Sequence, residues 1–392
     1  MTNNERWLLP DGMEELLPAQ AEQIEFLRRS ILRFYQRWGY RYVMTPLVEH
    51  FESLLVGTGN DVGEHTFKLV DEMTGRLLGV RADITPQVSR IDVHRLKQDG
   101  PSRLCYAGPV LLTKPRELGG SRNPIQIGAE LYGHEGIESD IEILELMVTS
   151  LYKANMEKVH VDLGHVGIFK SLIGHFSLDA EIESLLFDAL QRKAAPEISE
   201  ILAQASEQCK QAFNALLSLH GEESLFLTAR EQLSGINESV SKAVDELENI
   251  YNGLVKRCPE ISVHFDLAEL RGYRYHTGIV FAAYVPGYWQ AIAQGGRYDD
   301  VGKVFGRARP ATGYSMDLRA ICDLLPDFVD DSNPIFAPAD DDVELEKVIH
   351  DLRENGENVI RELPGQAGDA KQTGCKRILV KKNSQWLVES LG

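Results

Sequence analysis

The sequence has few cysteines, and those it has are scattered. Its 392 residues include only Cys105, Cys209, Cys258, Cys322 and Cys375. An odd number at wide spacing fits neither a disulfide framework nor a zinc ligand set, so we expect no metal site. Buried or idle reduced thiols are typical of a cytoplasmic protein, and we expect that location.

A long apolar run is also missing. Residues 1–10 contain neither the basic segment nor the apolar segment of a signal peptide, so none is predicted. No stretch approaches the roughly 20 apolar residues of a membrane span, and no membrane contact is expected. With 43% hydrophobic and 26% charged residues, the composition is that of a soluble globular protein.

Positive charge is in short supply. The chain has 41 basic and 59 acidic residues, which gives a net charge of −18. This balance favours solubility and opposes contact with a nucleic-acid backbone, although it leaves room for a local basic patch. We therefore expect no nucleic-acid partner. The length favours two or three domains.

The first 160 residues mix helical and strand patterns. Apolar side chains at helical spacing from Ile24 to Trp38 predict a helix that Gly39 ends. Ser139 and Glu142 have the spacing of a capping box and predict the start of another helix. A further helix is predicted at 86–97, and short apolar runs predict strands at 41–46, 67–70, 77–80, 104–107 and 125–132.

The remainder of the chain changes character twice. Residues 165–257 are mostly helical in pattern and read as an insertion, after which strand patterns return at 263–267 and 279–285. A last helix is predicted to begin near Ser315. We expect one α+β domain with an antiparallel sheet at 1–325. Residues 326–392 are expected to hold an acidic linker, which extends to Asp342, and a small domain without the usual apolar first strand.

Four short segments carry residues suited to binding a free amino acid: 81–86, 125–130, 271–278 and 295–299. The ammonium group of an amino acid needs a carboxylate and neutral acceptors, and its carboxylate needs an arginine or backbone donors. A polar ligand side chain needs buried partners. These requirements are met by Asp83, Gln126, Glu130 and Arg271. Gln126 and Glu130 are four residues apart on a predicted strand and therefore share a face.

Each of these residues alone has a more ordinary explanation. Asp83 before Thr-Pro is more often a turn or cap residue. Gln126 and Glu130 are more often the solvated face of a sheet, and Arg271 is more often a surface charge. Only the combination is informative.

In order along the chain, the segments resemble histidyl-tRNA synthetases. Residues 9–18 and 39–49 resemble the start and the first class II motif, and 125–133 resembles the second half of motif 2. Arg-Gly-Tyr-Arg-Tyr-His-Thr-Gly at 271–278 and Gly-Gly-Arg-Tyr-Asp at 295–299 resemble the two histidine signatures. Ala-Thr-Gly-Tyr-Ser-Met at 311–316 resembles motif 3. The resemblance covers about residues 8–325. It implies a class II synthetase-like antiparallel sheet flanked by helices, with a helical insertion, a small α/β C-terminal remnant and a homodimer formed through motif 1.

The resemblance also implies a histidine pocket. Asp83, where the family usually has glutamate, and Thr85 correspond to residues near the ligand ammonium. Gln126 corresponds to a residue that bridges toward the ammonium and carboxylate, Glu130 to one at the imidazole end, and Arg271 to one beside the carboxylate.

Two further pocket residues come from the first signature. Tyr275 matches its first tyrosine. His276 stands where the family has a second tyrosine that normally bonds the imidazole. A histidine there still offers a ring nitrogen, and its tautomer decides whether that nitrogen donates or accepts.

The residues for ATP chemistry are missing. Leu112 stands where motif 2 of the synthetases has an arginine, and Lys114 stands where it has a glutamate. Ala320 replaces the motif 3 arginine and Asp317 a glycine. Arginines at a reacting phosphate supply several kcal/mol of transition-state stabilisation, so this loss is severe. Three other arginines are out of register with these positions: Arg116, Arg122 and Arg319.

A synthetase core that keeps the amino-acid site but loses the ATP and tRNA sites is similar to the regulatory subunits of short-form ATP phosphoribosyltransferase. That family implies a non-catalytic, cofactor-free subunit that senses histidine as an allosteric ligand and assembles, four chains with four, with a short catalytic subunit. The alternatives are an active histidyl-tRNA synthetase with divergent motifs and a dimeric scaffold with a vestigial pocket.

Overall fold

The computed structural model describes residues 7–55, 63–115, 120–233, 235–326, 333–366 and 369–391. The chain divides into two compact units, Met1–Pro326 and Asp327–Gly392. Within the described residues, no helix is long and apolar enough to cross a membrane.

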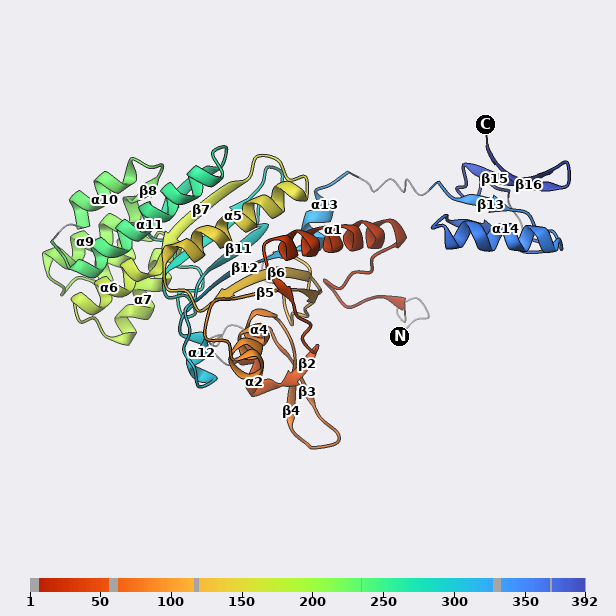
Figure 1. Ribbon diagram of the computed structural model, residues 1–392. Helices are drawn as coiled ribbons and strands as arrows, with labels where there is room; N and C mark the ends of the chain where they lie inside the picture. The colour runs from red at the N-terminus through yellow and green to blue at the C-terminus, as the bar shows by residue number, and fades with distance from the viewer. Residues whose placement is uncertain are drawn as a thin grey trace. The chain divides into compact units, whose positions relative to one another are not determined.

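The first unit is built on a nine-stranded sheet (Figure 1). Its pairings are antiparallel except for the β1–β5 and β7–β9 pairs. This confirms the predicted α+β class with an antiparallel sheet. The strand order is β1 (Arg41–Tyr42), β5 (Ser102–Pro109), β6 (Ile125–Tyr132), β12 (Ala311–Asp317), β11 (Ala293–Arg297), β10 (Ile279–Tyr284), β7 (His160–His165), β9 (Ser262–Asp266) and β8 (His220–Gly221).

Strand β6 separates the core from the functional face. Ile127, Ala129 and Leu131 belong to the main core cluster, which also contains the apolar sides of α1 (Pro18–Arg37) and α5 (Ile137–Lys153). Because side chains alternate along a strand, Gln126 and Glu130 lie on the opposite face. Figure 1 shows α1 and α5 lying across the sheet. A third helix, α13 (Leu318–Asp323), follows β12 directly.

Two groups of elements flank the sheet. A small sheet of β2 (Val48–His50), β4 (Leu77–Val80) and β3 (Phe67–Val70) is accompanied by α2 (Phe51–Leu55) and α4 (Thr85–Ile91), which continues as the π-helical turn η2 (Asp92–Leu96). The short α12 (Val301–Val304) follows β11. Between β7 and β9 the chain forms a helical cluster (Figure 1): α6 (Val166–His175), α7 (Ala180–Gln191), α8 (Ala195–Ile201), α9 (Glu207–Ser218), α10 (Leu225–Leu233) and α11 (Glu238–Arg257).

The second unit is a four-stranded sheet with one helix, α14 (Val343–Glu354). Its strand order is β14 (Val359–Arg361), β13 (Ile335–Ala337), β15 (Arg377–Lys382) and β16 (Gln385–Ser390). The expectation that this unit lacks an apolar first strand is wrong, because β13 is buried and pairs with strands on both sides. With three residues it is too short to give a strand signal.

Three local predictions are also wrong. The strand predicted at 41–46 is shorter, Arg41–Tyr42, and its pairing with β5 ends at the hydrogen bond from the Val43 N–H to the Cys105 carbonyl. Helix α5 begins at Ile137, with Gly136 as its N-cap, so Ser139 and Glu142 form no capping box. Their side chains bind distant partners instead, Arg297 and Arg103 respectively. Ser315 does not start a helix, since it lies in β12, and α13 begins three residues later.

Candidate functional site

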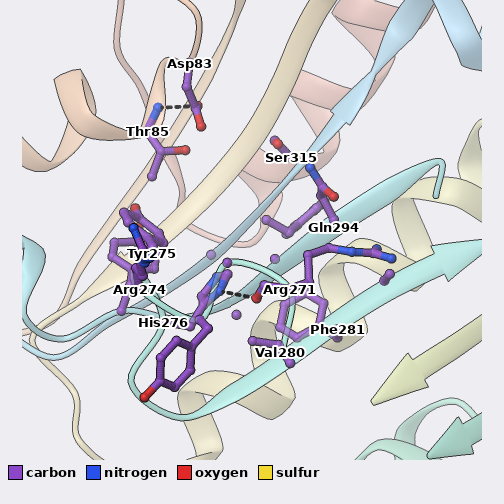
Figure 2. Close-up of a pocket in the computed structure, with 18 of the residues that line it drawn as sticks. Asp83, Thr85, Arg271, Arg274, Tyr275, His276, Val280, Phe281, Gln294 and Ser315 are labelled. Atoms are coloured by element: carbon purple, nitrogen blue, oxygen red, sulfur yellow. Dashed lines mark hydrogen bonds between the residues drawn. The ribbon is translucent and has the colours of Figure 1, made fainter. Parts of the chain in front are cut away.

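A cavity of about 500 Å³ lies over the functional face of the sheet. Its walls come from the segment before α4, from β6 and β10–β12, and from the loop that leads into β10 (Figure 2). Six of the predicted site residues line this one cavity: Asp83, Thr85, Glu130, Arg271, Tyr275 and His276.

Gln126 is the predicted residue that does not line it. Its side chain lines an adjoining cavity of about 150 Å³, which shares Leu112, Gln294 and Ser315 with the first. The amide Nε2 donates to Asp83 Oδ1 at 2.9 Å, and Oε1 accepts the Ile84 N–H at 2.9 Å. Gln126 therefore fixes the orientation of the Asp83 side chain from the adjoining cavity.

Glu130 is the most enclosed charged group of the site, at 1% exposure. Thr85 Oγ1 and Tyr106 Oη lie 3.0 Å from its Oε1 and donate to it, and the Tyr298 hydroxyl donates to Oε2. Burial nevertheless raises the pKa of Glu130 to about 8. A carboxyl that changes charge near neutral pH is thus fixed in the cavity wall.

Glycines make room for this carboxyl. A Cβ atom on Gly313 would lie 1.6 Å from Glu130 Oε2, and one on Gly295 would lie 2.1 Å from the Gly313 carbonyl oxygen. Both positions therefore exclude any side chain. The glycines of the second signature and of the motif 3 segment form the floor under the cavity.

Tyr275 offers an unused hydroxyl. Its ring stacks on Tyr298, with centroids 4.9 Å apart and planes at 26°. The hydroxyl oxygen is buried and has no hydrogen-bond partner among the described residues. Because an unpaired buried hydroxyl is costly, a polar ligand atom would stabilise it.

His276 has a defined tautomer. Its Nδ1 lies 3.1 Å from the carbonyl oxygen of Arg271, so this nitrogen carries the proton and Nε2 is the acceptor. Burial lowers the pKa of His276 to about 4, which keeps the ring neutral at pH 7. Lys170 Nζ, on α6, donates to the His276 carbonyl oxygen at 2.6 Å.

Arg271 lies at the other side of the cavity from Asp83. Its Nη2 donates to the Tyr284 hydroxyl at 3.0 Å and lies 3.8 Å from Glu269 Oε2. Figure 2 shows the guanidinium directed away from Asp83.

Sequence reasoning missed Tyr106, Tyr298 and His65. Tyr298 lay within the second signature, which was a usable signal. Nothing in the sequence singled out Tyr106, which reaches Glu130 only because β5 pairs with β6, or His65, which also lines the cavity.

The residues at the positions expected for ATP chemistry are either apolar or hydrogen-bonded to other parts of the protein. Leu112 is 2% exposed and apolar. The Asp317 carboxylate accepts the backbone N–H groups of Ile125 and Arg319 at 3.1 and 3.0 Å. Arg319 donates to the Glu14 carbonyl, and Arg122 donates to the Leu112 and Asp11 carbonyls. Arg116 lies outside the described residues.

The shifted pKa values predict a pH-dependent stability. The raised pKa of Glu130 means that the folded chain holds a proton that the unfolded chain releases, so this contribution to stability is lost as the pH rises toward about 8. The lowered pKa of His276 acts in the opposite sense, between about 4 and 6.5. From pH 6.5 to 8 we therefore expect the free energy of unfolding to fall by about 1–2 kcal/mol through Glu130.

Urea unfolding at both pH values measures this fall, and Glu130→Gln should remove it. An equal fall in the variant would contradict the assignment.

Comparison with known proteins agrees with this architecture. Residues 12–321 match the family model described as histidyl-tRNA synthetase. The solved histidyl-tRNA synthetase of a Nostoc species superposes with a TM-score of 0.76 at 19% identity over 98% of this chain and 97% of that one, which shows a shared fold. The fold and the cavity thus define a class II, histidyl-tRNA synthetase-like protein.

Comparison with more similar proteins identifies the family within this class. Residues 332–389 match the model described as the ATP phosphoribosyltransferase subunit HisZ C-terminal domain. The chain belongs to the family of ATP phosphoribosyltransferase regulatory subunits. Curated members from Thioalkalivibrio sulfidiphilus and Pseudomonas syringae are 50% and 48% identical over 100% of both chains. A solved structure from Bacillus halodurans C, described as an ATP phosphoribosyltransferase regulatory subunit/histidyl-tRNA synthetase, has a TM-score of 0.84 at 26% identity and covers 95% of this chain and 97% of that one. The resemblance drawn from the motifs is confirmed.

Proposed function

We propose that this chain is a non-catalytic regulatory subunit that binds L-histidine in the 500 Å³ cavity. It activates the short-form ATP phosphoribosyltransferase catalytic subunit and carries feedback inhibition to it, in the first step of histidine biosynthesis. The observation that carries this proposal is the contrast between two adjoining cavities. One keeps a buried carboxyl and unpaired polar atoms for an amino acid, whereas the other offers no free arginine among its described lining residues.

The polar groups of the larger cavity suit histidine. Asp83 and Thr85 can take the ammonium group at one end. Glu130 and the free hydroxyl of Tyr275 can take the imidazole, whose two nitrogens need one partner each. The neutral His276 ring adds an acceptor at Nε2 without adding charge.

The second cavity supports a subunit without adenylation activity. Its described lining is neutral except for Asp317, whose carboxylate already holds two backbone N–H groups. Among the described lining residues, a triphosphate there would meet the negative charge of Asp317 and no arginine. This arrangement disfavours an active synthetase.

The loop between β9 and β10 supplies a route for regulation. Tyr273, within the first signature, donates its hydroxyl to Glu183 Oε1 on α7 at 2.6 Å, and Lys170 on α6 binds the His276 carbonyl. The backbone N–H of Val166 binds the Gly278 carbonyl at 3.0 Å. Because the insertion helices hold the loop that lines the cavity, histidine binding would change the position of both. Such coupling is reciprocal, so substrates of the catalytic subunit should alter histidine affinity.

The assembly that we propose is a homodimeric core within a complex of four regulatory and four catalytic chains in the cytoplasm. The short strand β1 lies at one end of the large sheet and leaves an edge for a second copy. Two apolar side chains just beyond β1 are exposed in the single chain, Met44 at 77% and Leu47 at 46%. Exposed apolar side chains of this kind are expected where a second copy covers the surface. The acidic charge disfavours a nucleic-acid partner.

The direct test is phosphoribosyl-ATP formation by a purified short-form catalytic subunit, with and without this chain, over a histidine titration. We expect the chain to raise the rate and histidine then to suppress it. No change in either quantity would refute the proposal. Histidine-dependent ATP–pyrophosphate exchange by this chain alone would instead identify a synthetase.

A further inference from the structure

Tyr273, in the loop between β9 and β10, is buried against two helices of the insertion and is only 7% exposed. Its ring lies edge-on to that of Phe169 on α6, with centroids 5.0 Å apart, and packs on Phe187 of α7 at 5.5 Å. Lys170 Nζ lies over the same ring, 5.1 Å from its centroid. One aromatic side chain thus attaches the loop that lines the larger cavity to both α6 and α7.

The hydroxyl of Tyr273 adds a directional contact to this packing. It donates to Glu183 Oε1 on α7 at 2.6 Å. Burial, together with the hydrogen bond to Glu183, raises the pKa of Tyr273, so the hydroxyl keeps its proton and stays the donor. Hydrogen bonds to a carboxylate are stronger than those between neutral groups. Glu183 and Phe187 are four residues apart on one face of α7, so the bond and the ring contact fix the same face of the helix.

Helix α7 is itself part of the cavity wall. Phe187 and Asp188 line the cavity of about 500 Å³ together with loop residues that include Tyr273 and Arg274. A cavity of this size is in the range of about 300–1,000 Å³ that holds drug-sized ligands, and a free amino acid is smaller. The walls therefore enclose an amino acid fully only if part of them moves toward it. A movement of the loop would carry α7 with it through Tyr273.

We propose that Tyr273 and Glu183 are positioning residues whose hydrogen bond transmits histidine binding from the cavity loop to α7 and so to the insertion. The inference rests on the proposed function and adds to it the contact through which the regulation acts. An allosteric coupling free energy depends on the connection between two sites as well as on the sites themselves. A chain without this bond should therefore still bind histidine but no longer pass inhibition to the catalytic subunit.

The test uses two readouts on the full chain. Isothermal titration calorimetry gives the dissociation constant of histidine, and the complex with the catalytic subunit gives the ratio of phosphoribosyl-ATP formation rates without histidine and at saturating histidine. Glu183→Ala removes the acceptor, and Glu183 is not among the described residues that line the cavity. Tyr273→Phe removes the donor and keeps the buried ring, so it serves if Glu183→Ala does not fold. We expect each variant to lower the rate ratio at least about 5-fold and to change the dissociation constant by less than about 3-fold.

Two matched variants control for changes other than the loss of the bond. Glu183→Gln keeps an acceptor oxygen and should keep most of the inhibition. Glu181 is an exposed carboxylate in the same first turn of α7, so Glu181→Ala changes the helix charge equally and should behave like the wild-type chain. The double variant of Tyr273→Phe and Glu183→Ala should lose no more inhibition than either single variant, because both remove the same bond.

The outcomes separate this inference from the proposed function. Unchanged inhibition in both single variants, or additive losses in the double variant, would refute the role of the bond. Equal losses of histidine affinity and of inhibition would also refute it, since Tyr273 would then only shape the binding site. Each of these results leaves the proposed function in place. If the wild-type chain binds no histidine or does not inhibit the catalytic subunit, the proposed function fails and the inference fails with it.

Discussion

Replacing Glu130 by alanine should abolish histidine inhibition while the complex with the catalytic subunit still assembles. The carboxyl is enclosed by Thr85, Tyr106 and Tyr298 at the end of the cavity that we assign to the imidazole. Its loss removes a hydrogen-bonding partner of the ligand and leaves three buried hydroxyls without their acceptor. We expect the inhibitory histidine concentration to rise by at least about 100-fold.

The measurement is a histidine titration of phosphoribosyl-ATP formation, with assembly followed by size-exclusion chromatography. Glu130→Gln keeps an acceptor oxygen and should give an intermediate loss, which separates the effect of the ionisable carboxyl from that of side-chain shape. Glu197→Ala is the matched control, because Glu197 is an exposed carboxylate that pairs with the exposed Arg192. Unchanged inhibition in Glu130→Ala would show that the histidine site lies elsewhere.

The largest loss of stability is expected from Arg297→Ala. Arg297 Nη2 lies 2.8 Å from Asp140 Oδ2, and the two side chains are only 10% and 2% exposed. Removing the arginine leaves the Asp140 carboxylate buried without its counter-charge. We expect the free energy of unfolding of the first unit to fall by about 3–5 kcal/mol, as when one partner of a buried ion pair is removed.

Urea unfolding followed by fluorescence measures this fall. Removing Asp140 as well should recover part of it, since the uncompensated charge is then gone. Arg192→Ala breaks a pair whose side chains are 57% and 49% exposed, and it should cost less than about 1 kcal/mol. Similar losses for the two arginines would mean that the burial of the Arg297–Asp140 pair adds nothing to its strength.

The sequence predicted best where a local pattern and the tertiary fold agree. Strand β6 was predicted at the residues where it occurs, because its flanking residues stop the pattern and its side chains alternate between core and cavity. Strand β12 was missed because Ala311, Gly313 and Asp317 are residue types that are depleted in strands. The Ser139 prediction failed because the helix begins at Ile137, and the Ser139 hydroxyl, now inside the first turn, accepts from Arg297, 158 residues away.

Part of the site depends on strand register, which no motif records. Tyr106 lies opposite Gly128 on β6, and a Cβ on that glycine would lie 2.5 Å from the tyrosine hydroxyl. The missing side chain lets the hydroxyl reach Glu130. Asp83 and Glu130 were found because they stand within recognisable segments, whereas Tyr106 and His65 reach the cavity only through pairing between distant parts of the chain.

Asp317 has structural roles that oppose the return of a glycine to its position. Its carboxylate caps α13 and also holds the N–H of Ile125. Returning glycine to this position would cost a few tenths of a kcal/mol of helix capping and would also leave the Ile125 N–H without this acceptor. An arginine in place of the buried Leu112 would bury a charge without a partner. Each of these substitutions toward the synthetase residues would therefore destabilise the fold, so folding stability by itself favours the residues that are present.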